Sequence, residues 1–494
     1  MAARATVTRR AVLGTALVGG AGVAAARILG AGPVDATAAE PTTEPLTDSA
    51  ALVSGVDWIS PLGDERSRIA HLLRRTTLGY TAEELETAAA DGYERTVDRI
   101  LETPAAKPPL LAGADEASQE QPLRPDRLQT WWVDWMLRSP TPFAEAMTLF
   151  WHGHFTSEYR KVGVASPFMY WQNRTWREFA LADLRTMLYQ VTVDPAMLVY
   201  LDLAQSSGRN PNENYARELM ELYAMGSGTF TEDDVQAASK ALAGWRAPFT
   251  DAMRAALIAR AEELGRTLPR AIPPADAVKT GVFVAQRAYR GPAFGFLGVT
   301  KTWDTEAVID RILEQDSVAP FVAGKVLRRF VGPSVDDATI GRAAARFRAS
   351  GYDVRSLMRD VLRSPEFIAD ASYRNLVRSP IELMVSAAKA LNAPALSRLI
   401  VTSSPGFGHV LFDPPSVGGW TDGAGWVSSN GMLGRINFAT VAVQQTRSLP
   451  SSADAAALYL DSTVGPQTAA TLNTETDDRR RWVAVLSSPE AQLK

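Results

Sequence analysis

A helix-start signal that recurs along the chain constrains the fold more than any other feature of the sequence. Thr81 is followed three residues later by Glu84, and Thr141 and Ser379 are each followed by proline and, within about one turn, by glutamate. In a capping box the hydroxyl accepts a hydrogen bond from the first turn, and proline suits the first helical position. Apolar residues recur at helical spacing between these signals. We therefore expect a mainly α fold, with a multi-helix, bundle-like body.

The stretch 210–246 carries the densest set of helix signals. Asn210 is a good N-cap, and the first helix is expected to run to about Met225, where glycines end it. A second helix is expected to end near residue 244. The sequence thus predicts a helical hairpin with Trp245 and Arg246 at its exit.

The first hairpin helix carries a group of charged residues. Glu213, Arg217 and Glu221 are spaced four residues apart and share one stripe, with Glu218 beside it. One interpretation is a site in which a glutamate serves as acid, base or ligand and Arg217 binds an anionic group. The other is a solvated face of ion pairs.

The 494 residues include only four histidines, and two of them form a His-x-His pair. His152 and His154 follow a capped helix, and residues two apart on a helix face different ways. They converge on one metal only if the helix has ended, which Gly153 permits. We consider His152, His154 and Glu218 as candidate ligands of a divalent metal such as iron, manganese or zinc. The alternative is that both histidines pack beside aromatic residues.

Composition excludes several kinds of chemistry. The chain has no cysteine, which rules out disulfides, thiolate metal sites, iron–sulfur ligation and a cysteine nucleophile. Its net charge of −4 gives no electrostatic support to nucleic-acid binding. No Gly-x-Ser-x-Gly elbow, P-loop or dinucleotide fingerprint occurs in a suitable context.

The N-terminus is expected to direct export. The run Thr8-Arg9-Arg10-Ala11-Val12-Leu13 resembles a twin-arginine signal and is followed by a short, glycine-broken apolar run. We assign residues 1–38 to a signal peptide rather than a membrane anchor, and 39–60 to a linker. No later stretch is long and apolar enough to span a bilayer. A periplasmic, cell-wall or extracellular location is expected.

The remaining chain divides into two parts. Residues 61–450 are expected to form one helical domain with an insertion at 247–300, where 282–284 and 294–297 form a small hairpin or irregular pairing. Residues 451–494 are expected to form a helical tail. Within the domain, 404–437 is a glycine–aromatic loop that either lines a pocket or plugs the bundle end. The candidate binding residues are Asn212, Asn214, Trp245, Arg246, Trp420 and Trp426.

Several segments together resemble the bacterial family called domain of unknown function 1800. They are AHLLRRTTLGYT (70–81), MTLFWHGHFTSE (147–158), residues 210–245, FLG (296–298), VAGKVLRRFV (322–331), LRSPEFI (362–368), RSPIELMV (378–385) and residues 411–438. The resemblance implies an exported bacterial protein without established activity. It also implies a partner, the product of a neighbouring gene of the family domain of unknown function 1501, which looks related to alkaline phosphatases and sulfatases.

The chain departs from that family at two positions. Family members often carry histidine where this chain has Tyr223, and many have a His-Asp pair near Tyr289 and Arg290. If those histidines complete a metal site elsewhere, this chain has lost part of it. His152, His154, Glu213, Arg217, Glu218 and Glu221 match the family's motif positions.

Three functions are open at this point. The first is an extracytoplasmic, metal-assisted hydrolase that uses the histidines, glutamates and arginine just named. The second is a non-catalytic cell-envelope protein that binds a glycan or a partner through its aromatic residues. The third is a structural role, in which the polar cluster fixes helix register.

Overall fold

The computed structural model describes residues 59–117, 121–265, 279–452 and 454–494. The predicted signal peptide and residues 39–58 of the predicted linker lie outside the described residues. The described chain is mainly α-helical, as the sequence predicts, with two small two-stranded sheets. No helix in this part of the chain is long and apolar enough to cross a membrane.

The helices before the hairpin are α3 (Glu65–Thr76), α4 (Ala82–Asp91), α5 (Tyr93–Glu102), α6 (Pro125–Arg138), α7 (Pro142–His154), α8 (Tyr159–Val162), α9 (Phe168–Glu178), α10 (Leu184–Val193), α11 (Pro195–Tyr200) and the short η1 (Leu203–Gln205). The hairpin and insertion contain α12 (Asn214–Glu218), the π-helix η2 (Leu219–Ala224), α13 (Glu232–Ala241), β1 (Trp245–Arg246), α14 (Asp251–Glu263), β2 (Val282–Phe283), η4 (Ala285–Arg287), β3 (Phe294–Phe296) and β4 (Val299–Lys301).

The second half contains α15 (Thr305–Leu313), α16 (Val318–Phe330), α17 (Asp337–Ala349), α18 (Val354–Leu362), η5 (Asp370–Ser372), α19 (Pro380–Ala390), η6 (Pro394–Leu396), α20 (Ser397–Ser403), η7 (Ser404–Phe407), η8 (Gly423–Trp426), α21 (Ser429–Gln445), α22 (Ala455–Leu460), α23 (Pro466–Thr474), α24 (Asp478–Ser487) and η9 (Glu490–Gln492).

The helix starts predicted at Thr81, Thr141 and Ser379 are confirmed, but the side-chain capping bonds form at only two of these three positions. Thr81 and Ser379 both form complete capping boxes. Thr141 does not cap α7, because its hydroxyl accepts a hydrogen bond from the N–H of Ala106. Glu145 is likewise unavailable, since it forms a buried ion pair with Arg177.

The first hairpin helix differs from the prediction in two ways. Asn210 is not its N-cap, because residues 207 and 210 exchange backbone hydrogen bonds in a tight turn and α12 begins only at Asn214. The helix then widens into the π-helix η2 over Leu219–Ala224. A π segment is rare and occurs frequently at functional sites. It changes which carbonyl groups are left unpaired at the helix end.

The strand pairing in the insertion also differs from the prediction. Residues 282–283 pair with β1 rather than with residues 294–296, which form a hairpin with β4. The backbone explains this hairpin. Leu297 and Gly298 both have positive φ angles of 45° and 80°, as a tight two-residue turn of the primed type requires.

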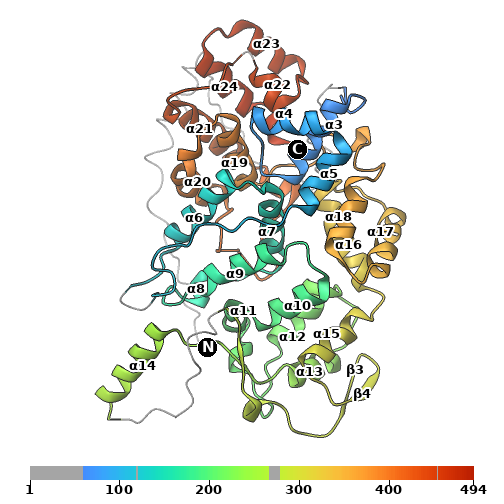
Figure 1. Cartoon of the computed structure of the whole chain (residues 1–494), viewed down its shortest axis with the longest axis vertical. Helices are drawn as coiled ribbons and strands as arrows, with labels where there is room; N and C mark the ends of the chain where they lie inside the picture. Colours follow the sequence, from blue (N-terminus) through green and yellow to red (C-terminus); the bar gives the residue numbers. More distant parts are fainter. Residues whose placement is uncertain (1–58, 118–120, 266–278, 453) are drawn as a thin grey trace, which may run out of the picture.

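Sequence-distant helices close one end of the body. Figure 1 shows α22–α24 beside α3 and α4, while α13, α15 and the β3–β4 hairpin lie at the opposite end and α14 projects outward. Arg74 of α3 forms a buried ion pair with Asp461, which follows α22. Trp482 of α24 is fully buried in the main core, together with residues of α3 and α7. The segment predicted as a tail therefore packs into the common core.

Candidate functional site

A cavity of about 270 Å³ lies where four of the family-like segments meet, and we call it the loop cavity. The end of α7, one face of α16, the start of α19 and the glycine–aromatic loop all line it. Gly153, His154, Lys325, Arg328, Arg329, Ser379, Glu382, His409, Trp420, Thr421, Asp422, Trp426 and Lys494 are among its lining residues. Cations and aromatic rings from separate segments thus share one space.

His154 and Lys325 form the floor of this cavity with the end of the hairpin helix. His154 Nε2 lies 3.0 Å from the carbonyl oxygen of Tyr223, and Lys325 Nζ lies 3.0 Å from that of Leu222. These carbonyl groups belong to the last turn of η2, where a helix leaves oxygens without partners. Lys325 Nζ also lies 3.0 Å from His154 Nδ1. The hairpin therefore does meet the histidine segment, but through backbone carbonyl groups and the Tyr223 ring rather than through its carboxylates.

The protonation state of this group follows from its bonds. Because a carbonyl oxygen only accepts, His154 Nε2 carries the proton and Nδ1 accepts from Lys325. Burial first, and then the neighbouring Lys325 charge, hold the pKa of His154 well below its usual range. Burial also lowers the pKa of Lys325 to about 8. Near neutral pH, a fraction of the protein molecules therefore carries Lys325 as an uncharged amine.

His152 faces away from His154, because α7 continues through both residues instead of ending at Gly153. Its Nε2 accepts a hydrogen bond from the Phe412 N–H at 3.1 Å, and its ring contacts Trp132 and Trp420. Burial, with a smaller effect of His409, lowers its pKa to about 3. His152 is a neutral packing residue behind the cavity wall.

The glycine–aromatic loop supplies the opposite wall. His409 stacks on Trp426 with ring centroids 4.9 Å apart and lies 5.2 Å from Trp420. Two buried nitrogens of this wall, His409 Nδ1 and Trp420 Nε1, have no hydrogen-bond partner in the described part of the chain. Gly419 fixes the loop, because its φ is +88° and a Cβ there would lie 2.6 Å from the carbonyl oxygen of Gly153.

Positive charge exceeds negative charge around the loop cavity. Arg329 Nη2 binds Glu382 at 2.5 Å, and Lys494 binds the same carboxylate. Arg328 is exposed, and neither it nor Lys325 has a carboxylate partner within the described ranges. Four cationic side chains therefore line the cavity with only two acidic side chains, those of Glu382 and Asp422. An anion is the ligand that balances this arrangement.

The charged face of the hairpin lies apart from the imidazoles. Arg217 binds Glu232 at 2.6 Å and Glu213 at 3.6 Å, while Glu221 accepts from Ser227. Burial raises the pKa of Glu218, and Glu221 adds to this effect. Within the described residues, no hydrogen bond or ion pair joins these carboxylates to His152 or His154.

The described part of the chain contains no group of three histidine, cysteine, aspartate or glutamate side chains that could hold a metal. His152, His154 and Glu218 are therefore not brought together as a ligand set. Tyr223 packs its ring against His154 and its hydroxyl points to Met197. Tyr289 packs against Phe294 in the insertion.

Four predicted binding residues belong to other surroundings. Trp245 and Arg246 form β1, and the Trp245 indole donates to Thr305. The side chain of Asn212 accepts from the N–H of Asn214 and so supports the turn before α12. Only Trp420 and Trp426 of the predicted binding residues line the loop cavity.

Sequence reasoning missed most of the polar residues of the cavity: Lys325, Arg328, Arg329, Glu382 as a partner of cations, the neutral His409 and Lys494. One signal was available for Lys325. It lies three residues after Val322 and one before Val326, both buried, so it occupies the apolar side of α16. A charged residue at such a position points to a specific partner or ligand.

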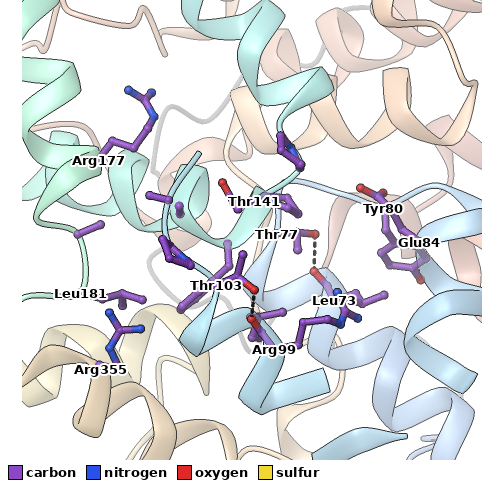
Figure 2. Close-up of a pocket in the computed structure, with 18 of the residues that line it drawn as sticks. Leu73, Thr77, Tyr80, Glu84, Arg99, Thr103, Thr141, Arg177, Leu181 and Arg355 are labelled. Atoms are coloured by element: carbon purple, nitrogen blue, oxygen red, sulfur yellow. Dashed lines mark hydrogen bonds between the residues drawn. The ribbon is translucent and has the colours of Figure 1, made fainter. Parts of the chain in front are cut away.

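A second cavity, of about 370 Å³, lies between α3, α5 and α7, and we call it the threonine cavity. Figure 2 shows two of its hydroxyl groups bonded to backbone, that of Thr77 to the carbonyl oxygen of Leu73 and that of Thr103 to the carbonyl oxygen of Arg99. Arg177, at its edge, is held by Glu145. These polar groups are satisfied by the protein itself.

A family model described as "Protein of unknown function (DUF1800)" matches residues 71–493. The match spans the loop cavity, the hairpin and the C-terminal helices. No curated protein and no solved structure matches the chain.

Proposed function

The chain belongs to the family of proteins of unknown function DUF1800, and we propose that it is an exported protein that binds an acidic glycan in the loop cavity. The observation that carries this proposal is that cationic side chains without a carboxylate partner in the described chain line the same cavity as two tryptophan rings. Lys325 and Arg328 face a space that Trp420 and Trp426 also line.

The two walls suit two parts of such a ligand. Guanidinium and ammonium groups bind carboxylate or phosphate through charge-assisted hydrogen bonds. An indole offers a rigid apolar face and a polar N–H, and the Trp420 Nε1 has no partner in the described chain. A sugar ring with an acidic substituent presents an apolar face and an anion. Export is supported by the twin-arginine-like run at Arg9 and Arg10.

A metal-assisted hydrolase has less support. His154 uses both ring nitrogens in bonds to Tyr223 and Lys325, and His152 uses Nε2 to accept from Phe412. No carboxylate bonds to either imidazole within the described residues. In metal sites that activate water, a carboxylate or carbonyl group usually orients the histidine ligand while its other ring nitrogen binds the metal. Binding therefore accounts for more of the observed contacts than hydrolysis does.

Tryptophan fluorescence tests the proposal directly. The protein is titrated with a trisaccharide of galacturonic acid and with the neutral trisaccharide of galactose. We expect the acidic ligand to bind and the neutral one to bind at least about tenfold more weakly, since a hydrogen bond to a charged group contributes about 1.5–3 kcal/mol.

Two arginine variants locate the site. Arg328→Ala is expected to weaken binding of the acidic sugar about tenfold. Arg217→Ala, in the hairpin, is the matched control and is expected to leave the affinity unchanged. Equal affinity for both sugars, or a loss caused by Arg217→Ala alone, would exclude the loop cavity as the anion site.

A further inference from the structure

Lys325 differs from the other two largely buried lysines of the described chain. Lys389 binds Glu84 at 3.0 Å, and Lys494 binds Glu382. Lys325 instead has two uncharged acceptors, an imidazole nitrogen and a carbonyl oxygen. Structural lysines are usually buried with a carboxylate, because an unpaired buried ammonium is costly. The surroundings of Lys325 are those of a reactive amine rather than an ion-pair partner.

The geometry leaves one position on Lys325 Nζ for a ligand. The neutral lysine amine has two N–H donors and one lone pair, and the bonds to His154 and Leu222 use both donors. Lys325 lines the loop cavity, so the remaining direction is available to a molecule bound there. Arg328 and Arg329 line the same space and would hold the anionic part of that molecule.

We propose that Lys325 forms an imine with a ligand that carries both a carbonyl group and a carboxylate. This chemistry is shared by 2-oxo acids and by the reducing end of a uronic acid. The inference deepens the proposed function, since it rests on the same cavity binding an anion, and adds that the ligand is captured covalently and reversibly.

The step is a condensation without change of oxidation state. The Lys325 nitrogen lone pair attacks the carbonyl carbon and forms a C–N bond, while the carbonyl oxygen takes up a proton. This oxygen takes up a second proton and leaves the carbinolamine as water when the nitrogen lone pair forms the C=N bond. The nitrogen releases its two protons in the course of the reaction, which balance the two that the oxygen takes up, so that one amine and one carbonyl group give one imine and one water. Lysine amines of lowered pKa in apolar pockets are suited to this reaction.

Reductive trapping tests the inference on the full chain. The protein is incubated with sodium cyanoborohydride and either pyruvate or galacturonic acid, and the labelled lysine is located by peptide mass mapping. We expect one label per chain on Lys325 with at least one probe. Pyruvate alone identifies a 2-oxo acid site, and galacturonic acid alone a site for reducing sugars. Lactate, which has a carboxylate but neither an aldehyde nor a ketone group, is expected to leave no label.

Two lysine variants and a separate binding measurement with the acidic trisaccharide show whether the label comes from Lys325. Lys325→Arg keeps the positive charge and is expected to abolish the label, whereas Lys161→Arg, on the surface, is expected to leave it unchanged. If Lys325→Arg fails to fold, the mapped position in the wild-type chain decides. Label spread over surface lysines, or no label with either probe, overturns the imine. Retained binding of the acidic trisaccharide in that case shows that the imine alone has failed.

Discussion

The loop cavity and the threonine cavity differ in how their polar groups are bonded. Around the larger threonine cavity, Arg177 is paired with Glu145 and Arg99 with Asp91, and Thr77 donates to a backbone oxygen. Around the smaller loop cavity, Lys325 and Arg328 have no carboxylate partner in the described structure. Volume alone would therefore favour the threonine cavity over the loop cavity. An excess of one charge is the better mark of a binding site, because a ligand must supply what the protein does not.

Acid should destabilise the fold through its four buried histidines, two of which, His154 and His409, line the loop cavity. The pKa values of His152 and His409 are lowered to about 3 by burial, and those of His71 and His154 lie well below the usual range. Their folded pKa values are below the unfolded value, so the unfolded state binds more protons and their stability contribution is lost as pH falls below about 6.5. Each imidazole costs up to about 1.4 kcal/mol per pH unit in that window.

One buried carboxylate opposes this trend. Burial raises the pKa of Asp194 to about 7, so its contribution to stability grows as pH falls from there. The expected net loss is about 4 kcal/mol per pH unit below pH 6.5. Urea unfolding at pH 7.5 and pH 5.5 measures it, and Asp194→Asn should steepen the loss. An unfolding free energy independent of pH would contradict the neutral, buried state of the histidines.

Removing the paired charge beside the threonine cavity should destabilise the fold. Glu145 is fully buried and accepts from Arg177 and from the indoles of Trp132 and Trp135. Glu145→Ala leaves the buried Arg177 charge with only the uncharged acceptors of Asn173, and we expect a loss of about 3–5 kcal/mol in unfolding free energy.

Glu178→Ala is the matched control, because Glu178 also lines the threonine cavity but is exposed. Its expected effect on unfolding free energy is within about 0.5 kcal/mol. Thermal or urea unfolding compares the two variants. Similar losses for both would show that the buried pair has no special role.

Removing the unpaired charge of the loop cavity should have the smallest effect on stability. Arg328 is exposed and unpaired in the described chain, so Arg328→Ala is expected to change the unfolding free energy by less than about 0.5 kcal/mol. If Arg328→Ala keeps its stability but loses affinity for the acidic sugar, the charge at the loop cavity serves binding, whereas the charge at the threonine cavity serves stability. A large loss of stability would instead make Arg328 a structural residue.

The fold was predictable where helix signals act locally. The capping boxes at Thr81 and Ser379 depend on residues within one turn and are confirmed. At Thr141 the helix start is right but the capping bond is absent, because the hydroxyl accepts from Ala106. The start at Asn210 is wrong, because Asn210 lies in a backbone turn and the helix begins only at Asn214. The π-helix η2 was not predictable, since its widened turn is tied to contacts with α7 and α16 rather than to local propensity.

The site was predictable only in part. The sequence selected His154, Trp420 and Trp426, which the structure brings to one cavity. Charge density drew attention to Glu213 and Arg217, but their ion pairs with each other and with Glu232 are satisfied on the hairpin itself. Spacing along one helix reports neighbours on that helix. It carries no information on which distant segment, here α16, supplies the partner of His154.

The crystal structure of the protein with a galacturonic acid trisaccharide tests the central claim most directly. The account predicts the sugar in the loop cavity, with a carboxylate against Arg328 or Lys325 and a ring against Trp420 or Trp426. A sugar bound on the Arg217 face of the hairpin or in the threonine cavity, or no bound sugar at a concentration that saturates the fluorescence change, would contradict it.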